Sequence, residues 1–242
     1  ALSVFYDLKD PNKFLRNVQK ILDPEGIFLL EFQDLSLILK NLMFDTICHE
    51  HLEYYSVNVV HKMATQNNLR MIDHMYNDIN GGSSTYLISH KNNKFKANYK
   101  KITKIISNEK KIGTENIKKY KRYFKKITKL KIRLNKLLNK LKKQGKTIHG
   151  YGASTKGNVL LQFCNINSKH LDYICDRNQE KYNLFTPGTS IKIISEKYSR
   201  SLKPDYYLVL PWHFKKEILK REIKTIKNGT KFIFPLPKLE II

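Results

Sequence analysis

The sequence predicts an α/β protein in which a doubly wound C-terminal domain follows a long amphipathic helical segment. After Gln144, short apolar segments typical of buried strands alternate with helical segments, and such alternation builds a parallel sheet covered by helices. Between residues 99 and 144, apolar residues recur at helical spacing opposite a face rich in Lys.

The first part of the chain is predicted to contain helices and strands in mixed order. Asp10 suits an N-cap and Pro11 a first helical turn, so a helix is expected over 10–22. The remaining elements expected here are a strand at 26–32, a helix at 57–68, and strands at 69–77 and 85–91 around the turn NGGSS (80–84).

Residues 99–144 are predicted to form one long amphipathic helix that connects two domains. Its apolar face is expected to contain Ile117, Tyr120, Phe124, Ile127, Leu134, Leu138 and Leu141. Packing on a surface or a partner helix explains this face better than a calmodulin-like or membrane-surface role.

The C-terminal elements alternate regularly. They are strands at 146–152, 170–178, 204–212 and 230–237, a loop and helix at 153–165, and a helix at 214–228 that Gly229 stops.

The net charge of +24 raises the question of a nucleic-acid partner. Lys supplies most of the 45 basic residues, and aromatic residues are not interleaved with them as stacking on bases would need. We therefore expect no nucleic-acid partner, and instead an attraction for anionic small molecules such as sugar diphosphates. No apolar run is long enough to span a membrane, and three Cys without metal spacing suggest free thiols in a reducing cytoplasm.

The segment GYGASTKGN (150–158) closes a predicted strand and opens a helix, where free N–H groups and Lys156 could bind an anion. It departs from a Walker motif at Asn158, and Thr155 stands where a dinucleotide fingerprint has its third Gly. Asp176 ends the next strand, where a ribose-binding acid would lie. The alternative is a tight strand–helix turn that binds nothing.

The segment DTICHEHLEYYS (45–56) places His49, Glu50 and His51 beside Tyr54 and Tyr55. A zincin would need a second His three residues after His-Glu, which is missing, so no metal site is expected. A structural His pair remains one explanation. A general base is the other, because imidazole titrates near neutral pH and a neighbouring carboxylate can orient it.

Several motifs occur together in a characteristic order, and they span essentially the whole chain. They are DTICHEHLEYYS (45–56), NGGSS (80–84), GYGASTKGN (150–158), TPGT (186–189) and LPWHF (210–214). In this order and spacing they resemble the bacterial sugar C-methyltransferases, which use S-adenosylmethionine to methylate a carbon of a nucleotide-linked keto-deoxysugar.

The resemblance implies a division of the chain. Residues 1–98 are expected to be the last part of a Rossmann-like methyltransferase domain, 99–144 a linking helical segment, and 145–242 a complete Rossmann-like C-terminal domain. The zinc-binding region and the main S-adenosylmethionine loop of the family are expected to lie upstream of Ala1. The abrupt start of the chain fits that expectation.

The resemblance also implies catalytic roles. His51 is the expected base that removes the proton next to the ketone, Glu50 would assist or orient it, and His49 is a second candidate. Some relatives carry Tyr where this chain has Cys48, and here the role of that phenol would be lost or taken by Tyr54 or Tyr55. At Tyr6-Asp7 several relatives show a His.

The expected substrate-binding residues bring together several of the motifs. They are Asn80, Tyr151, Lys156, Asn158, Asp176, Trp212 and His213. Among them Lys156 is expected at the diphosphate, and Trp212 is equally well explained as core. A non-catalytic nucleotide-sugar binding module and a nicotinamide-dependent oxidoreductase remain alternative functions.

Overall fold

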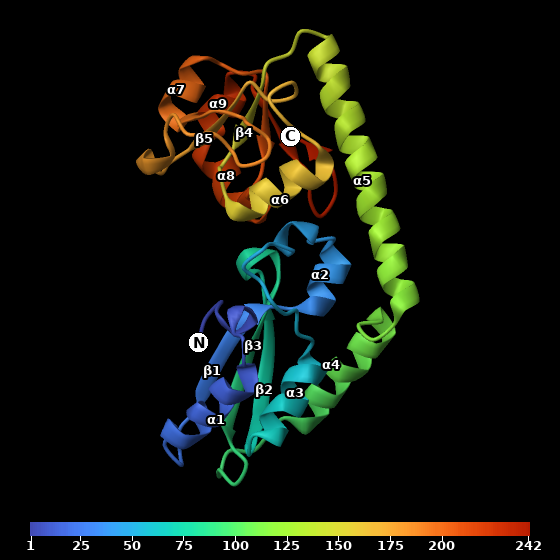
Figure 1. Cartoon of the computed structure of the whole chain (residues 1–242), viewed down its shortest axis with the longest axis vertical. Helices are drawn as coiled ribbons and strands as arrows, with labels where there is room; N and C mark the ends of the chain where they lie inside the picture. Colours follow the sequence, from blue (N-terminus) through green and yellow to red (C-terminus); the bar gives the residue numbers. More distant parts are fainter. The chain divides into compact units, whose positions relative to one another are not determined.

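The computed structural model describes residues 1–242, and the chain forms two compact units (Figure 1). The first unit comprises Ala1–Met43 and His49–Tyr123, and the second comprises Phe44–Cys48 and Phe124–Ile242. No helix combines the length and the apolar character that crossing a membrane requires.

The first unit contains an antiparallel sheet in which β3 lies between the other two strands. Its strands are β1 (Phe28–Gln33), β2 (Leu69–Asn77) and β3 (Ser83–His90). The three predicted strands are thus confirmed, with ends shifted by up to two residues. A bulge between Met71 and Asp73 interrupts the register of β2 with β3.

Helices of the first unit accompany this sheet. They are α1 (Pro11–Ile21), α2 (Leu35–Asn41), α3 (Val57–Gln66), α4 (Tyr99–Ile112) and the start of α5 (Ile117–Lys143). The predicted cap is confirmed, because the Asp10 carboxylate accepts a hydrogen bond from the backbone N–H of Lys13 at 2.8 Å. Helices α3 and α4 lie beside β2 (Figure 1).

An aromatic cluster forms much of the core of the first unit. Phe5 stacks on Phe32 at a centroid distance of 5.5 Å, and Tyr55 lies 5.1 Å from Phe5. Tyr86 of β3 lies 5.3 Å from Phe32 and is fully buried. Such rings contribute strongly to stability through the area that they bury.

The prediction of one continuous helix over 99–144 is wrong. Helix α4 ends at Ile112, and Gly113 adopts a left-handed conformation (φ 96°) that closes its C-terminus. Helix α5 starts after Asn116, whose side-chain oxygen accepts a hydrogen bond from the Lys118 N–H at 2.9 Å. A left-handed Gly at a helix end is the common C-terminal signal, so the break has a local cause.

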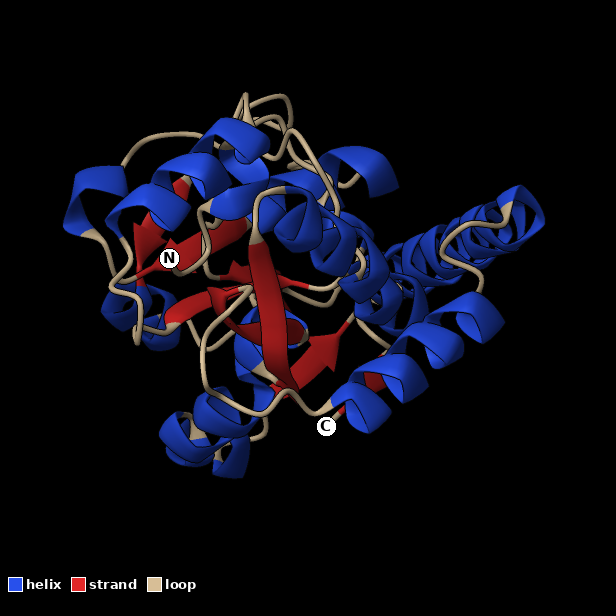
Figure 2. Ribbon diagram, turned by 90° about the horizontal axis from the view of Figure 1, so that it is seen from below, coloured by secondary structure: helices blue, strands red, loops and turns tan.

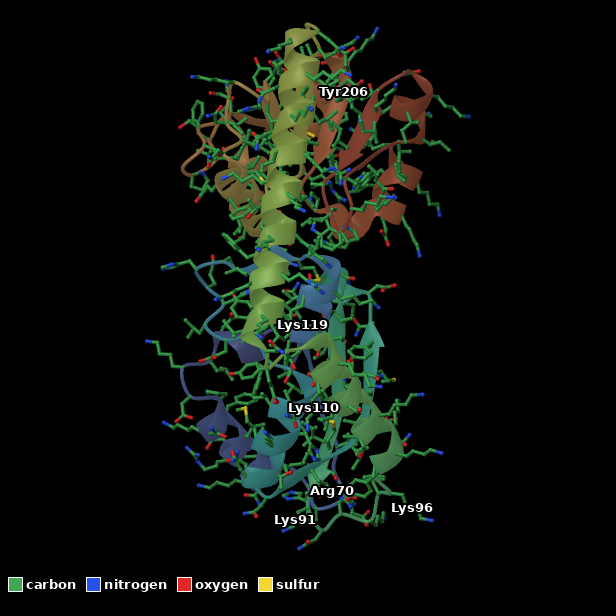
Figure 3. The ribbon with its side chains drawn as sticks, turned by 90° about the vertical axis from the view of Figure 1, so that its right-hand side faces the viewer. Arg70, Lys91, Lys96, Lys110, Lys119 and Tyr206 are labelled. Carbon is green, nitrogen blue, oxygen red and sulfur yellow. The ribbon has the colours of Figure 1, made fainter.

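The predicted apolar face of α5 is correct only in its C-terminal part. Leu134 and Leu138 are fully buried, whereas Ile117 and Phe124 are 68% and 59% exposed. At 3.6 residues per turn, these two residues lie about 80–100° around the helix from Leu134. The exposed side of α5 also carries many Lys residues, including Lys119 (Figure 3).

The second unit contains a six-stranded sheet in the order β6-β5-β4-β7-β8-β9. Its strands are β4 (Ile148–Tyr151), β5 (Tyr173–Asp176), β6 (Ile193–Ser195), β7 (Tyr206–Val209), β8 (Lys231–Phe234) and β9 (Glu240–Ile241). All pairings are parallel except that of β8 with β9. This mixed α/β architecture confirms the predicted Rossmann-like fold. Helices lie outside the strands (Figure 2).

Helices of the second unit follow most strands. They are α6 (Thr155–Cys164), α7 (Glu196–Ser201), α8 (Lys215–Arg221) and α9 (Ile223–Lys227), with the larger part of α5. The predicted single helix over 214–228 is divided at Glu222, which is 1% exposed. Asn135 of α5 donates a hydrogen bond to the Cys164 carbonyl at 2.7 Å, which ties α5 to the end of α6.

Candidate functional site

The glycines of the GYGASTKGN segment are explained by packing within the second unit. Gly152 has φ 85°, and a Cβ there would lie 2.8 Å from Cδ of Pro211. A Cβ on Gly150 would lie 2.6 Å from Ile174. These positions therefore require Gly because neighbouring side chains approach the backbone, which favours the tight-turn interpretation for the glycines themselves.

Asp176 supports this turn from the end of β5. Its Oδ2 accepts a hydrogen bond from the Ala153 N–H at 2.7 Å, and its Oδ1 accepts one from the Asn178 N–H at 2.8 Å. The ammonium of Lys181 lies 3.6 Å from Oδ2. Both carboxylate oxygens thus hold protein groups, an arrangement that differs from a carboxylate left available to a ribose hydroxyl.

The turn leads into the amino end of α6, where polar and charged side chains gather. Ser154 caps this helix by accepting a hydrogen bond from the Gly157 N–H at 3.1 Å. The stretch Phe44–Cys48 packs against the same helix, and the Phe44 and Phe163 rings lie 4.8 Å apart. The first residues of the DTICHEHLEYYS motif therefore belong structurally to the C-terminal unit.

Asp45 forms the central polar contact of this stretch. The Trp212 indole N–H donates a hydrogen bond to its Oδ2 at 2.7 Å, and the two side chains are 6% and 1% exposed. Burial raises the pKa of Asp45, while the charge of Lys156 and the hydrogen bond from Trp212 act to lower it. Oδ1 of Asp45 is also buried and has no hydrogen-bond partner.

Lys156 and His213 share this environment. Burial lowers the pKa of the Lys156 ammonium, whereas the charges of Asp45 and Cys48 act to raise it. Burial together with the nearby Lys156 charge lowers the pKa of His213 to about 4, so the imidazole is neutral at physiological pH. Its Nδ1 is buried without a partner.

The structure therefore brings together three of the predicted substrate-binding residues: Lys156, Trp212 and His213. It adds Asp45, which opens the DTICHEHLEYYS motif but is not among the predicted site residues. Asn158 lies on the same helix and is half-buried. A half-buried cation at a helix amino end, next to a neutral imidazole and an indole, is suited to hold an anionic ligand group.

Tyr151 lies apart from this group. Its hydroxyl donates a hydrogen bond to Glu222 at 2.8 Å, and the Arg221 guanidinium stacks over its ring at 5.5 Å. The side chain is 2% exposed, and burial raises the pKa of its hydroxyl. These contacts give Tyr151 a structural role in the second unit.

The predicted catalytic residues lie in the first unit, on the segment that follows Cys48. His49 and Glu50 form an exposed turn, and His51 is half-buried. The His51 ring packs on Tyr6 at a centroid distance of 4.2 Å, while Tyr54 lies 6.4 Å away. This differs from a strand, in which the two His residues would share one face.

Tyr6 also holds the backbone of this segment. Its carbonyl accepts hydrogen bonds from the N–H groups of Leu52 and Glu53, at 2.9 and 3.2 Å. Tyr6 stands where the resemblance expects a His in several relatives, and here it contacts His51 directly. His51 is therefore the member of the His-Glu-His group that the fold positions most firmly.

Asn80 lies in the short 3-10 helix Ile79–Gly81 with a left-handed backbone (φ 56°). Its carbonyl accepts a hydrogen bond from Gln33 at 2.9 Å. In the following serines, the buried Ser84 hydroxyl donates to Asp34 at 2.9 Å and lies 2.8 Å from the His74 ring nitrogen. The NGGSS segment therefore supports the sheet of the first unit.

No group of three or more His, Cys, Asp or Glu side chains is arranged to hold a metal ion. The Cys residues are all free thiols, with Cys164 and Cys175 buried.

Comparison with known proteins identifies relatives of the whole chain. The family model described as the C-methyltransferase C-terminal domain matches residues 78–237. The chain is 30% identical over 241 residues to C-methyltransferase NovU of Streptomyces niveus, an alignment that covers 98% of this chain and 56% of NovU. The chain thus spans about half the length of this relative. It belongs to the C-methyltransferase family.

Proposed function

We propose that this chain is part of an S-adenosylmethionine-dependent C-methyltransferase that acts on a nucleotide-linked keto-deoxysugar. The observation that carries the proposal is the similarity to NovU, which extends over both units of this chain. The sugar and its nucleotide rest on the resemblance of the ordered motifs.

We propose the same division of the chain into domains that the sequence predicts. Residues 1–98 belong to the catalytic domain, 99–144 link the two domains, and 145–242 form the C-terminal domain. The family match over 78–237 supports a common origin of the latter regions.

The cofactor does not fit the one glycine-rich turn of this chain. The side chains of Pro211 and Ile174 pack closely against Gly152 and Gly150, and the Asp176 carboxylate accepts hydrogen bonds from backbone N–H groups. We therefore assign the main S-adenosylmethionine site to the part of NovU that this chain does not cover. The same contacts argue against a nicotinamide-dependent oxidoreductase.

In this proposal His51 acts on the acceptor. Its imidazole takes the proton from the carbon next to the ketone, the C–H electron pair forms the enolate, and the enolate carbon becomes the nucleophile. General-base assistance of this kind is worth roughly 10²–10⁴ in rate. Packing on Tyr6 would restrict the imidazole to one orientation, and Glu50 and Tyr54 lie close enough in the chain to assist.

In the second unit, Lys156 would bind the diphosphate of a nucleotide sugar. Its ammonium lies at the amino end of α6, where helix N–H groups also favour an anion. Trp212 and His213 would line the site beside it, and an incoming phosphate would stabilise the charged form of the partly buried Lys156.

Proton exchange provides a direct test that needs no methyl donor. A thymidine diphosphate keto-deoxysugar is incubated with the chain in D₂O, and NMR follows the loss of the proton next to the ketone. We expect faster exchange than without protein, a decrease of about 10²-fold or more in His51→Asn, and little change in the matched variant His49→Asn. Equal rates of proton exchange with His51→Asn and with the parent chain would show that His51 is not the base.

Calorimetry tests the binding part of the proposal. The thymidine diphosphate sugar is expected to bind this chain, whereas S-adenosylmethionine alone is not. Lys156→Ala should weaken binding of the nucleotide sugar on the order of tenfold, while Lys192→Ala, an exposed Lys of the same unit, should not. If both variants bind equally well, Lys156 lies outside the diphosphate site.

A further inference from the structure

A polar cavity lies in the C-terminal unit, away from the amino end of α6. It has a volume of about 320 Å³ and opens where β7 and β8 begin. Its lining consists of Arg200, Lys203, Pro204, Asp205, Lys224, Thr225, Asn228, Gly229 and Thr230. The turn at 152–154 follows the opposite end of the parallel sheet, after β4, so the two sites are distinct.

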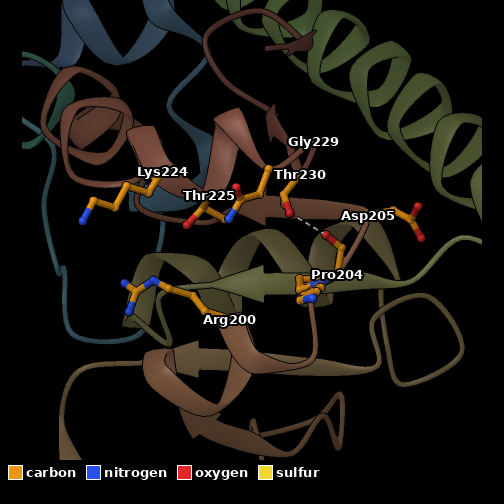
Figure 4. A pocket seen from close by; sticks show the side chains of 9 residues that line it. Arg200, Pro204, Asp205, Lys224, Thr225, Gly229 and Thr230 are labelled. Atoms are coloured by element: carbon orange, nitrogen blue, oxygen red, sulfur yellow. Dashed lines mark hydrogen bonds between the residues drawn. The ribbon is translucent and has the colours of Figure 1, made fainter.

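Cations dominate the wall of this cavity. Arg200 and Lys224 lie on one side of it in Figure 4, while the carboxylate of Asp205 points away from them. Asp205 is engaged elsewhere, since Lys146 pairs with it at 2.8 Å and Thr147 donates two hydrogen bonds to it. Asp205 is therefore not available to balance the charge of Lys203 and Lys224 in the lining.

The nearest other carboxylate is also satisfied. Glu222 accepts hydrogen bonds from Arg200, from the Thr225 hydroxyl at 2.7 Å and from Tyr151 at 2.8 Å. Lys203 and Lys224 form no ion pair in the structure, and Lys203 is held in a left-handed backbone conformation (φ 47°). Lys203 and Lys224 thus belong to the cavity lining and have no acidic partner.

The opposite wall provides neutral hydrogen-bonding groups. The Thr230 hydroxyl donates to the Pro204 carbonyl at 2.9 Å (Figure 4), and the exposed Asn228 also belongs to the lining. Such groups suit the hydroxyls of a sugar. The volume lies at the lower end of the range for small-molecule pockets, ~300–1,000 Å³, and exceeds what a single phosphate ion needs.

Interaction with helix ends is the simpler explanation of these lysines. Helices α7 and α9 both end beside the cavity, and cations stabilise helix C-termini. However, these helices have only six and five residues, and each contributes at most about half a negative charge. The Arg200 guanidinium is balanced by Glu196 and Glu222, but the two ammonium groups of Lys203 and Lys224 exceed the charge of the helix ends, so the cavity remains positive.

We propose that this cavity binds the phosphate ester of a small sugar, with the phosphate at Lys203 and Lys224 and the hydroxyls at Asn228 and the neutral wall. The site is independent of the proposed methyltransferase chemistry, because it shares no residue with the Lys156 group or with His51.

Calorimetric titration of the 242-residue chain at low ionic strength tests the proposal, with glucose 6-phosphate, inorganic phosphate and glucose as probes. We expect saturable binding of glucose 6-phosphate, weaker binding of phosphate, and no binding of glucose. Lys224→Gln and Lys203→Asn should each weaken binding of the ester on the order of five- to tenfold. Asn tolerates the left-handed backbone at position 203.

The matched control is Lys227→Gln, which removes an exposed charge from the same short helix outside the cavity lining. It should bind glucose 6-phosphate as the parent chain does. Thermal unfolding checks that each variant is folded. An equal loss in Lys227→Gln and Lys224→Gln, or no saturable binding by the parent chain, would overturn the proposal.

Discussion

The hydrogen bond between Trp212 and Asp45 offers the sharpest test of how the C-terminal unit holds the start of the DTICHEHLEYYS motif. The two residues are 167 positions apart, and both side chains are almost fully buried. Trp212→Phe removes the donor, and Asp45→Ala removes the acceptor. A double-mutant cycle with both changes isolates their interaction from the cost of each substitution.

The expected size follows from the environment of the bond. A hydrogen bond to a charged group contributes about 1.5–3 kcal/mol, and one between neutral groups about 1 kcal/mol. Burial raises the pKa of Asp45 above its usual 3.8, so the carboxyl becomes charged only at higher pH than in the unfolded chain. We expect a coupling energy of about 1 kcal/mol in acid that increases towards 2–3 kcal/mol at pH 8.

The total contribution of Asp45 to stability should change in the opposite direction. A carboxyl group with a raised folded-state pKa binds its proton more tightly in the folded protein. Its contribution is therefore greatest below the unfolded-state pKa and decreases as the pH rises through the folded-state pKa. Asp45→Ala should thus become less harmful, relative to the parent chain, at higher pH.

Urea unfolding followed by circular dichroism measures all four members of the cycle at pH 5 and pH 8. Trp212 is the single Trp of the chain, so its fluorescence also reports directly on the environment of the indole in Asp45→Ala. A coupling energy below about 0.5 kcal/mol at both pH values would refute the reasoning, since distant independent sites are additive within that margin.

Two further variants test local structure. The Glu109 carboxylate accepts hydrogen bonds from the backbone N–H groups that open α3, and burial raises its pKa to about 7 from 4.5. The parent chain should therefore lose stability between those pH values, whereas Glu109→Gln should lack this dependence. Unfolding measured at pH 4.5 and 7.5 tests this. The same pH dependence of stability in the parent chain and in Glu109→Gln would contradict this prediction. Gly152→Ala should lower the unfolding midpoint more than Gly145→Ala, because both have positive φ but only Gly152 would place its Cβ against Pro211; equal effects would mean that strain alone matters.

The elements that could be predicted from sequence are those with a local cause. The Asp10 cap, the strand ending at Asp176 and the parallel order of the C-terminal sheet follow from residue type and hydrophobic pattern. The break after α4 also had a local signal at Gly113, which the helical periodicity on either side obscured. The break at Glu222 had none, because it accompanies a buried pairing with Arg200 that only the tertiary fold creates.

The candidate site shows the same distinction. Lys156 could be singled out because it follows a glycine-rich strand end, a pattern that is typical of anion sites. Asp45 could not, since nothing near it in sequence indicates that its partner is Trp212. The position of Asp176 alone predicts a ribose ligand, but both of its carboxylate oxygens accept hydrogen bonds from neighbouring backbone N–H groups.

The DTICHEHLEYYS segment therefore combines two physical roles. Asp45 is fixed by Trp212 in the C-terminal unit and influences the charge of Lys156, whereas His51 is fixed by Tyr6 in the first unit. A substitution at Asp45 should consequently act on nucleotide-sugar affinity and on the stability of the C-terminal unit. A substitution at His51 should act on proton exchange, because His51 lies in the first unit and packs on Tyr6 there. Measuring affinity and exchange on both variants separates anchoring from acid–base chemistry within one motif.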